Sequence, residues 1–213
     1  MTPAEQSRRA AGICALAPVV PVLVIDRIED AAPLARALVA GGLPALEVTL
    51  RTPAALDAIR AMAEVEGGMV GAGTLLTPAD VKAAKAAGAR FGVSPGATDR
   101  LLTACEQEGL PLLPGAATAT EVMALLEKGY TVQKFFPAEA SGGAPALAAI
   151  GAPIPQVRFC PTGGIGPKNV GDYLGLSNVL CVGGSWVAPK DLVAAGDWAA
   201  IEAMARAASA LPR

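Results

Sequence analysis

The sequence contains no histidine in its 213 residues. Without imidazole, the chain cannot build a Ser-His-Asp or Cys-His catalytic arrangement, and it cannot bind a metal through histidine ligands. Acid–base chemistry must therefore come from Glu, Asp, Lys, Tyr or Cys. This one absence excludes several large classes of hydrolases and metalloenzymes.

The cysteines form no recognisable motif. Cys14, Cys105, Cys160 and Cys181 lie far apart, and none belongs to a C-x-x-C pair, so neither a zinc cluster nor a thioredoxin-like motif is expected. Cys160 and Cys181 lie in apolar, strand-like runs, where cysteine behaves as a small hydrophobic residue. We therefore expect reduced thiols in a cytoplasmic protein, with no metal and no cofactor.

Long apolar runs and basic runs are also missing. The longest apolar stretch, residues 13–25, is interrupted by Pro18 and Pro21 and is shorter than the roughly 20 residues that span a membrane. Residues 8–17 resemble a signal peptide only superficially, because Pro18 follows the apparent cleavage site. With 17 Lys and Arg against 19 Asp and Glu, no basic groove is expected. The predicted partners include neither membranes nor nucleic acids.

Strand-like and helix-like segments alternate along the whole chain. Helices are expected over residues 28–40, 53–65 and 120–128, the second of them with Thr52 as its N-cap. Further helices are expected to begin near Pro78, Thr98 and Pro167. Strands are predicted at residues 18–25, 45–50, 69–73, 90–93, 110–113, 131–136, 156–160 and 178–182.

This alternation predicts an α/β fold. Eight strand–helix units close most naturally into a (β/α)8 TIM barrel, so we predict a single barrel domain over residues 1–213. Residues 1–16 form an extra N-terminal helix in this prediction and cap the bottom of the barrel. A doubly wound open sheet is the alternative, but it would normally carry a glycine-rich turn after its first strand, where residues 25–28 read Ile-Asp-Arg-Ile.

The second predicted strand carries polar residues on one face. Glu47, Thr49 and Arg51 alternate with apolar residues, and the two-residue period places the polar set on the opposite face from the apolar set. The apolar face should meet the helices, so the polar face brings a carboxylate and a guanidinium to the mouth of the barrel. An ion pair between Glu47 and Arg51 without any chemistry is the alternative. A buried ion pair contributes little stability on its own, which favours a functional role.

Lys134 differs from the other lysines because it lies in the middle of a strand. The two-residue period groups it with Val132 and Phe136, whereas the other lysines lie on alanine-rich helices or in loops. Desolvation of a lysine disfavours its ammonium form and makes a nucleophilic amine available near neutral pH. The alternative is an aliphatic stem that carries the ammonium group out to solvent.

Two glycine-rich turns follow the last two predicted strands. Thr162-Gly163-Gly164 ends one strand, and Gly183-Gly184-Ser185 ends the next. Paired glycines expose backbone N–H groups, and phosphate sites of this fold recur after strands seven and eight. The turns therefore predict a phosphate-binding site.

Six segments that carry these residues resemble the 2-keto-3-deoxy-6-phosphogluconate (KDPG) aldolase family. The likeness extends in order from about residue 18 to residue 186. It rests on residues 46–51 (LEVTLR), 71–74 (GAGT), 94–96 (SPG), 134–138 (KFFPA), 159–165 (FCPTGGI) and 183–186 (GGSW). Members of this family are class I, Schiff-base aldolases of the Entner–Doudoroff pathway. They often also cleave 4-hydroxy-2-oxoglutarate, and they form trimers.

The resemblance implies a role for each candidate residue. Lys134 would form the Schiff base and Glu47 would shuttle protons. The carboxylate end of the keto acid would be held by Arg51 and Thr74, in a pocket lined by Pro95 and Phe136. The phosphate contacts would come from Thr162, Gly163, Gly164, Gly184 and Ser185.

We therefore expect a metal-independent lyase of carbohydrate metabolism. It would cleave KDPG to pyruvate and glyceraldehyde 3-phosphate, and 4-hydroxy-2-oxoglutarate to pyruvate and glyoxylate, as a cytoplasmic homotrimer. Two alternatives remain open. A phosphosugar isomerase or synthase on the same barrel would use Glu47 as a base and Lys134 only electrostatically, and a non-catalytic binding protein for phosphorylated metabolites would need only the glycine turns.

Overall fold

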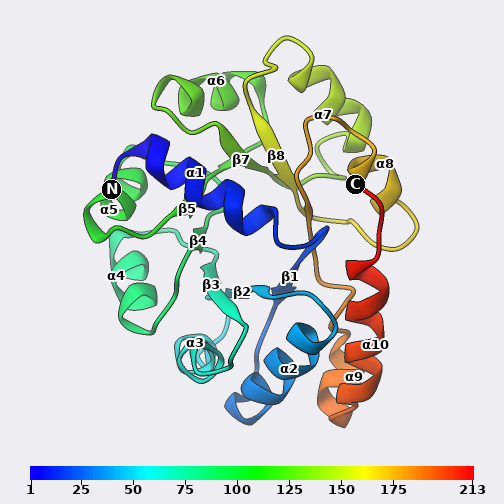
Figure 1. The fold of residues 1–213 in the computed structure, drawn as a ribbon. Helices are drawn as coiled ribbons and strands as arrows, with labels where there is room; N and C mark the ends of the chain where they lie inside the picture. The colour runs from blue at the N-terminus through cyan, green and yellow to red at the C-terminus, as the bar shows by residue number, and fades with distance from the viewer.

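The computed structural model describes residues 1–213, and strands and helices alternate along the chain as predicted (Figure 1). The strands are β1 (Val19–Leu23), β2 (Ala45–Thr49), β3 (Met69–Gly73), β4 (Gly92–Val93), β5 (Leu112–Leu113), β6 (Gly115–Ala116), β7 (Val132–Phe135), β8 (Arg158–Pro161) and β9 (Val182–Gly184). The helices are α1 (Pro3–Cys14), α2 (Ile28–Ala40), α3 (Ala55–Ala63), α4 (Pro78–Ala86), α5 (Asp99–Glu108), α6 (Ala119–Glu127), α7 (Gly143–Gly151), α8 (Val170–Leu174), α9 (Lys190–Ala195) and α10 (Trp198–Ser209).

The strands form a curled, entirely parallel sheet. One part has the order β5-β4-β3-β2-β1-β9, and the other has the order β6-β7-β8. Only Pro114 separates β5 from β6, so the chain passes from one part to the other there. Isolated parallel bridges between Phe159 and Val179, and between Thr162 and Gly183, connect β8 to the segment that contains β9.

Two predicted strands differ in detail from the structure. The strand predicted over residues 110–113 is shortened to β5, and a further strand that was not predicted, β6, follows it and pairs with a different neighbour. The segment predicted over residues 178–182 also changes partner: Leu180 N–H donates to Phe159, whereas Val182 N–H donates to Pro18. Regular pairing therefore begins only at Val182, because the sheet curls at this point.

Helix α3 begins later than predicted. We expected Thr52 to cap a helix that starts at Pro53, but the helix begins at Ala55. The Thr52 hydroxyl instead donates a 2.5 Å hydrogen bond to the carbonyl of Ile25, which ties this turn to the end of β1. Helices α4 and α5 begin at the predicted positions, and Thr77 and Thr98 cap them by accepting a hydrogen bond from the backbone N–H three residues on.

The side chains of each strand divide between two apolar clusters. The larger cluster has 50 buried residues and fills the space between the sheet and the surrounding helices; it includes Val19, Leu46 and Val48. The smaller cluster has 11 buried residues inside the curl, among them Val20 and Val132. The alternation of Val19 and Val20 between clusters follows the two-residue period of a strand. Polar residues that share the inner face therefore point into the interior.

Helix α1 lies across the amino ends of the strands (Figure 1). Thr2 and Glu5 form a capping box at its start, a device that satisfies two otherwise unpaired backbone donors. Gln6 Oε1 accepts a 3.0 Å hydrogen bond from Leu112 N–H, and Ser7 Oγ accepts one of 2.9 Å from Thr131 N–H. These buried bonds fix the helix beneath the sheet and leave the carboxyl ends of the strands open.

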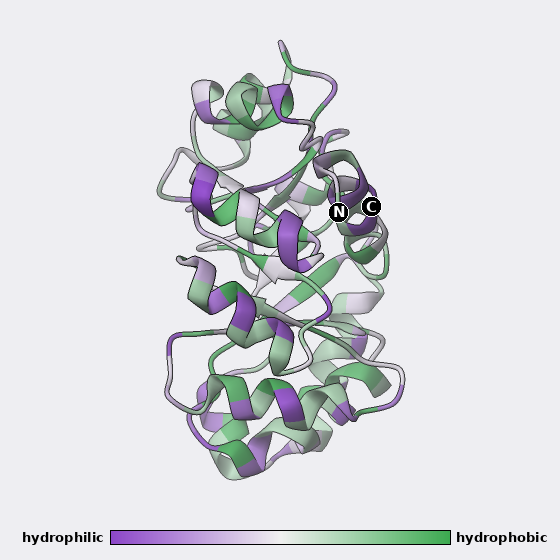
Figure 2. Ribbon diagram, turned by 90° about the vertical axis from the view of Figure 1, so that its left-hand side faces the viewer, coloured by the Kyte–Doolittle hydropathy of each residue, from purple (hydrophilic) through white to green (hydrophobic).

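The helices on the outside carry mixed surfaces. Figure 2 shows hydrophilic and hydrophobic bands alternating along them, as expected for helices with one face on a core. None of the ten helices has both the length and the apolar character needed to cross a membrane.

Candidate active site

Glu47 and Lys134 meet inside the curled sheet, although 87 residues separate them. Lys134 Nζ lies 3.3 Å from Glu47 Oε1, and the two residues are 5% and 3% exposed. Glu47 comes from β2 and Lys134 from β7, so their side chains reach toward each other across the interior. The alternative of a lysine that extends to solvent does not describe this structure. The sheet instead brings an amine and a carboxylate together away from water.

The environment of Glu47 increases its affinity for a proton. Burial raises the pKa of Glu47 above its usual value of 4.5, while the positive charge of Lys134 opposes this change in part. A general acid–base group becomes more effective as its pKa approaches the working pH. Glu47 is therefore suited to acid–base chemistry next to an amine.

Arg51 does not form an ion pair with Glu47, so the alternative of a self-contained Glu47–Arg51 ion pair does not apply to this structure. Its Nε donates a 3.1 Å hydrogen bond to Thr49 Oγ1 instead. The Thr49 hydroxyl in turn donates a 2.8 Å hydrogen bond to the carbonyl of Leu23. Arg51 is exposed at the end of β2, so its guanidinium remains available to an anion at the mouth of the site.

Phe136 covers Lys134 from the carboxyl end of β7. The Lys134 ammonium lies 5.2 Å from the centre of the Phe136 ring, within the range of a cation–π contact. The ring is only partly buried. Phe136 is thus placed to exclude water from the amine on one side and to contact a ligand on the other.

Thr74 and Pro95 follow β3 and β4 at the same end of the sheet. Thr74 has φ +62°, and it is the one residue other than glycine with positive φ. This conformation is rare for a β-branched residue and is found where function requires a fixed backbone. Pro95 lies directly against Gly115, where a Cβ would overlap the Pro95 carbonyl. Both residues are half-buried at the mouth.

The two glycine-rich turns lie side by side. Thr162 and Gly183 form a parallel bridge, and a Cβ on Gly183 would overlap the Thr162 side chain. Gly163 and Gly164 have φ +106° and +78°, a region open to glycine at no steric cost. Glu139 N–H donates to the Gly163 carbonyl, so this turn also joins the segment after β7. Gly184 is buried, whereas Ser185 is exposed just beyond β9.

The eleven predicted site residues lie within strands or in the short segments that follow their carboxyl ends. The structure brings Lys134, Glu47 and Phe136 into direct proximity, and it places the two glycine turns next to each other. Arg51, Thr74 and Pro95 follow β2, β3 and β4 at the same end of the sheet, and none of them is hydrogen-bonded to the Lys134 side chain.

The sequence analysis missed two residues that shape this site. Gly73 is paired with Thr49, and a Cβ there would overlap the Glu47 carboxylate. Ser94 is fully buried beside Pro95, and its hydroxyl has no hydrogen-bond partner in the protein. Both lie within the GAGT and SPG segments, but no spacing rule indicated their individual roles.

The spacing of the cysteines along the sequence also did not predict that three of them lie together in the fold. Cys14, Cys160 and Cys181 are buried together, with their sulfur atoms within 4.8 Å of one another. They lie beneath the Glu47–Lys134 pair, between α1 and the last two strands. This is the one group of three Cys, Asp or Glu side chains close enough to share a metal ion.

Comparisons with known proteins agree with this geometry. A family model described as KDPG and KHG aldolase matches residues 11–204. The chain is 53% identical to the KHG/KDPG aldolase of Escherichia coli (strain K12) over 200 residues, 93% of this chain and 94% of that protein.

Solved structures agree as well. The KDPG aldolase of Zymomonas mobilis ZM4 with 3-phosphoglycerate superposes with a TM-score of 0.93 at 51% identity, covering 97% of this chain and 98% of that one. The KDPG aldolase from Legionella pneumophila, with pyruvate captured as a covalent carbinolamine, gives 0.91 at 48% identity, covering 94% and 98%. The chain therefore belongs to the KDPG and KHG aldolase family.

Proposed function

We propose that this protein is a class I aldolase that cleaves KDPG to pyruvate and glyceraldehyde 3-phosphate, and 4-hydroxy-2-oxoglutarate to pyruvate and glyoxylate. The observation that carries the proposal is the buried contact between Lys134 and Glu47. An amine beside a carboxyl group with a raised pKa supplies both a nucleophile and a proton carrier. The relatives at about half sequence identity are named for the same activities.

The reaction begins when Lys134 loses a proton and attacks the C2 carbonyl of the keto acid. Glu47 lies 3.3 Å from Nζ, so it can take this proton without moving far. Glu47 returns this proton to the carbinolamine hydroxyl, and loss of water gives an iminium ion and leaves Glu47 as a carboxylate. The relative from Legionella pneumophila holds pyruvate as a carbinolamine of this kind. The iminium then acts as the electron sink that a metal ion supplies in other aldolases.

Bond cleavage requires a second proton transfer. Glu47, directly or through water, accepts the proton of the C4 hydroxyl, and the electrons of the C3–C4 bond move into the iminium. Glyceraldehyde 3-phosphate leaves, and an enamine remains on Lys134. Protonation at C3 and hydrolysis release pyruvate and restore the amine. One carboxyl group therefore serves several steps, which is consistent with a chain that has no histidine.

The remaining residues would recognise the two ends of the substrate. Arg51 and Thr74 hold the keto-acid carboxylate in this proposal, since Arg51 presents a free guanidinium face near the mouth. Pro95 and Phe136 line the pocket around the reacting carbons. The phosphate is held by the backbone and hydroxyl groups of Thr162, Gly163, Gly164, Gly184 and Ser185. The positive φ angles of Gly163 and Gly164 support this role, because such turns aim consecutive N–H groups at an anion.

We extend the proposal to the fold, the cellular location and the oligomeric state of the enzyme. The chain forms one closed (β/α)8 barrel over residues 1–213, with residues 1–16 as a helix that caps its amino end. Support comes from the β1–β9 pairing together with the Thr162–Gly183 bridge. The free cysteines suit a reducing compartment, so we place the enzyme in the cytoplasm. Family membership supports a homotrimer that acts in the Entner–Doudoroff pathway without a cofactor.

Covalent trapping tests the mechanism. Incubation with pyruvate and borohydride should inactivate the enzyme and add one reduced pyruvate adduct per chain, on Lys134. Mass spectrometry of peptides locates it. Lys82 and Lys128 serve as internal controls, because Lys82 lies on the outer helix α4 and Lys128 directly follows α6. An inactivated enzyme with unmodified Lys134 would exclude the Schiff base and favour an isomerase or synthase. A binding protein would show no turnover of KDPG at all.

A further inference from the structure

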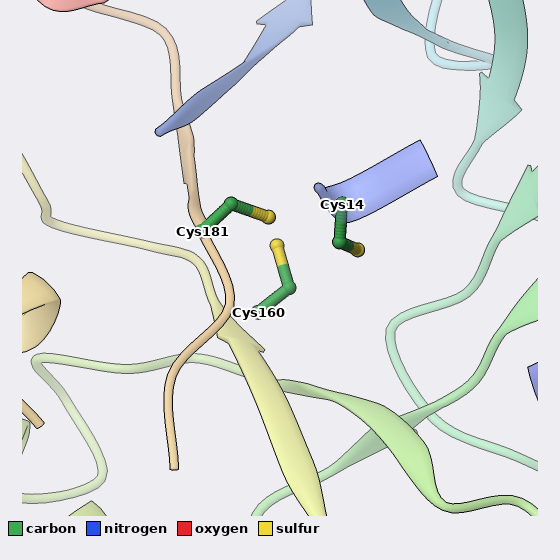
Figure 3. Close-up of side chains that lie close together, drawn as sticks. All are labelled: Cys14, Cys160 and Cys181. Carbon is green, nitrogen blue, oxygen red and sulfur yellow. The ribbon is translucent and has the colours of Figure 1, made fainter. Parts of the chain in front are cut away.

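Three buried thiols form a cluster that the aldolase chemistry does not use. Cys14 is the last residue of α1, Cys160 lies in β8, and Cys181 directly precedes β9. Their three Sγ atoms all lie within 4.8 Å of one another, and the residues are 2%, 2% and 0% exposed. Figure 3 shows the Cys160 and Cys181 side chains pointing toward each other, with Cys14 beside them.

The surroundings of this cysteine cluster are apolar except on one side. Cys14 and Cys160 line a small cavity together with Phe91, Val93 and Glu47. The cavity has room for about one water molecule. Cys160 is also the residue paired in register with Lys134. The cluster therefore lies in mostly apolar surroundings, with Glu47, Lys134 and Thr162 as its polar neighbours.

The three thiols share their protons unequally. Hydrogen bonds from Cys14 and Cys181, together with the charge of Lys134, lower the pKa of Cys160 well below its usual value. The contact with Cys160 raises the pKa of Cys14, and the contacts with Cys14 and Cys160 raise the pKa of Cys181. One sulfur is thus more readily ionised than the other two, and the thiolate is the form that binds metals.

We propose that Cys14, Cys160 and Cys181 form a binding site for one soft, thiophilic divalent metal ion of the zinc and cadmium class. Metal–sulfur bonds of about 2.3 Å place the ligand sulfurs of a tetrahedral ion about 3.8 Å apart, so the cluster needs a contraction of at most about 1 Å. Binding converts M²⁺ and three thiols into a tris-thiolate complex and three released protons. The complex carries one negative charge, which the nearby Lys134 ammonium partly compensates.

A water molecule can fill the fourth coordination position of the ion. Zinc and cadmium favour four ligands, and the cavity beside Cys14 and Cys160 has room for a water molecule. Such an ion would tie the end of α1 to β8 and to the segment before β9. Its role would therefore be structural, because it would hold the helix against the amino ends of the strands.

Cadmium is a suitable probe because its thiolate complexes absorb in the ultraviolet. Reduced, metal-free enzyme should bind one Cd²⁺ per chain and develop a thiolate-to-cadmium charge-transfer band. Excess Mg²⁺ should produce no band. At a free concentration about 100-fold above Kd, the melting temperature should rise by about 5–10 °C. Affinity should increase with pH, because binding displaces protons.

Variants separate this site from adventitious binding. The Cys14→Ser/Cys181→Ser enzyme should lose stoichiometric binding and the rise in melting temperature. Cys105→Ser is the matched control, because Cys105 is also buried but lies in α5, outside the cluster. It should bind Cd²⁺ as the wild type does. Circular dichroism and pyruvate trapping on Lys134 verify that each variant is folded.

Cd²⁺ must pass α1 to reach the buried cysteine cluster, so binding to the folded protein can be slow. Each protein is therefore measured after long incubation and after refolding with Cd²⁺. Stoichiometric binding in the refolded wild type alone would still support the site and would identify α1 as the barrier. The proposal is wrong if neither procedure gives a saturable band. It is equally wrong if the folded double variant binds as tightly as the Cys105→Ser control.

Discussion

The backbone of Gly73 lies directly against the carboxylate of Glu47, so that a Cβ at position 73 would occupy the space of Oε1. The contact follows from the sheet, because Gly73 on β3 is paired with Thr49 on β2, two residues beyond Glu47. A side chain at this position would push the carboxylate away from Lys134. The absence of a side chain at Gly73 is therefore a condition for the geometry of the site.

Gly73→Ala should disturb catalysis by displacing Glu47. We expect kcat for KDPG to fall about a hundredfold, the scale of a misplacement of about 1 Å, with a loss of stability of about 1–3 kcal/mol from overpacking. Borohydride trapping of pyruvate on Lys134 should persist. Gly12→Ala is the control, since a Cβ there meets nothing within 4 Å. Unchanged kcat in folded Gly73→Ala enzyme would mean that the carboxylate position is not critical.

Glu47→Gln should separate imine formation from proton transfer. The amide keeps the volume of the carboxyl group but cannot shuttle protons, so turnover should fall on the order of 10²-fold or more. Pyruvate should still be trapped on Lys134. Exchange of the pyruvate C3 protons with deuterium, followed by NMR, should slow in parallel.

Asp57→Asn is the control for that experiment, because Asp57 is an exposed carboxylate on α3 that pairs with Arg60. It should leave turnover and exchange unchanged. Exchange at the wild-type rate in Glu47→Gln would assign the base elsewhere, with Thr49 and a bound water as the remaining candidates.

The buried Glu47 carboxyl group should also leave a signature in the pH dependence of stability. Burial raises its pKa above 4.5 in the folded protein, so the folded state holds this proton more tightly than the unfolded state does. Its contribution to the free energy of unfolding should therefore fall as the pH rises from about 4.5 to the folded-state pKa, and then level off.

Urea denaturation of the wild type and of Glu47→Gln at successive pH values measures this contribution as the difference between the two curves. Lys134→Met removes the charge that opposes the raised pKa, so in that background the decline should extend to higher pH. A difference that does not vary with pH would show that Glu47 titrates alike in the folded and unfolded states.

The glycine turns should matter most for phosphorylated substrates. In Gly164→Ala the new Cβ would lie 2.6 Å from Glu139 Cγ and would keep an unfavourable φ of +78°. Ser185→Ala removes one hydroxyl donor. A lost hydrogen bond to a charged group costs about 1.5–3 kcal/mol, so kcat/KM for KDPG should fall about tenfold to a hundredfold. Cleavage of 4-hydroxy-2-oxoglutarate, which has no phosphate, should change much less.

Gly166→Ala provides the matched control for this pair, because a Cβ at Gly166 meets nothing within 4 Å and its φ is not positive. It should leave both substrates unaffected. Equal losses for both substrates in Gly164→Ala and Ser185→Ala would place the phosphate site elsewhere and make the turns purely structural.

The two-residue period of a strand predicted that Glu47 points into the interior and that Lys134 lies among apolar neighbours. Both side chains are buried, and they meet inside the curled sheet. The period cannot report which residues from distant strands meet. The Glu47–Arg51 alternative was tenable for this reason, because it concerned neighbours in the sequence.

Features that depend on packing between several elements could not be read from the sequence. The cysteine cluster joins α1, β8 and the segment before β9, and no spacing rule covers ligands that are so far apart. The partition of residues 110–116 between β5 and β6 reflects the curl of the sheet rather than any local propensity. Gly73 was visible only as one glycine in a glycine-rich strand.

The anchoring of α1 determines the order in which the chain can complete its fold. Gln6 and Ser7 bond to backbone groups 106 and 124 residues farther along the chain. A ribosome makes α1 first, yet the helix has no native docking surface until β5 and the start of β7 have emerged and assembled. The first element to be synthesised can therefore dock only after more than half of the chain has emerged, and until then the interior that holds Lys134 remains open at its amino end.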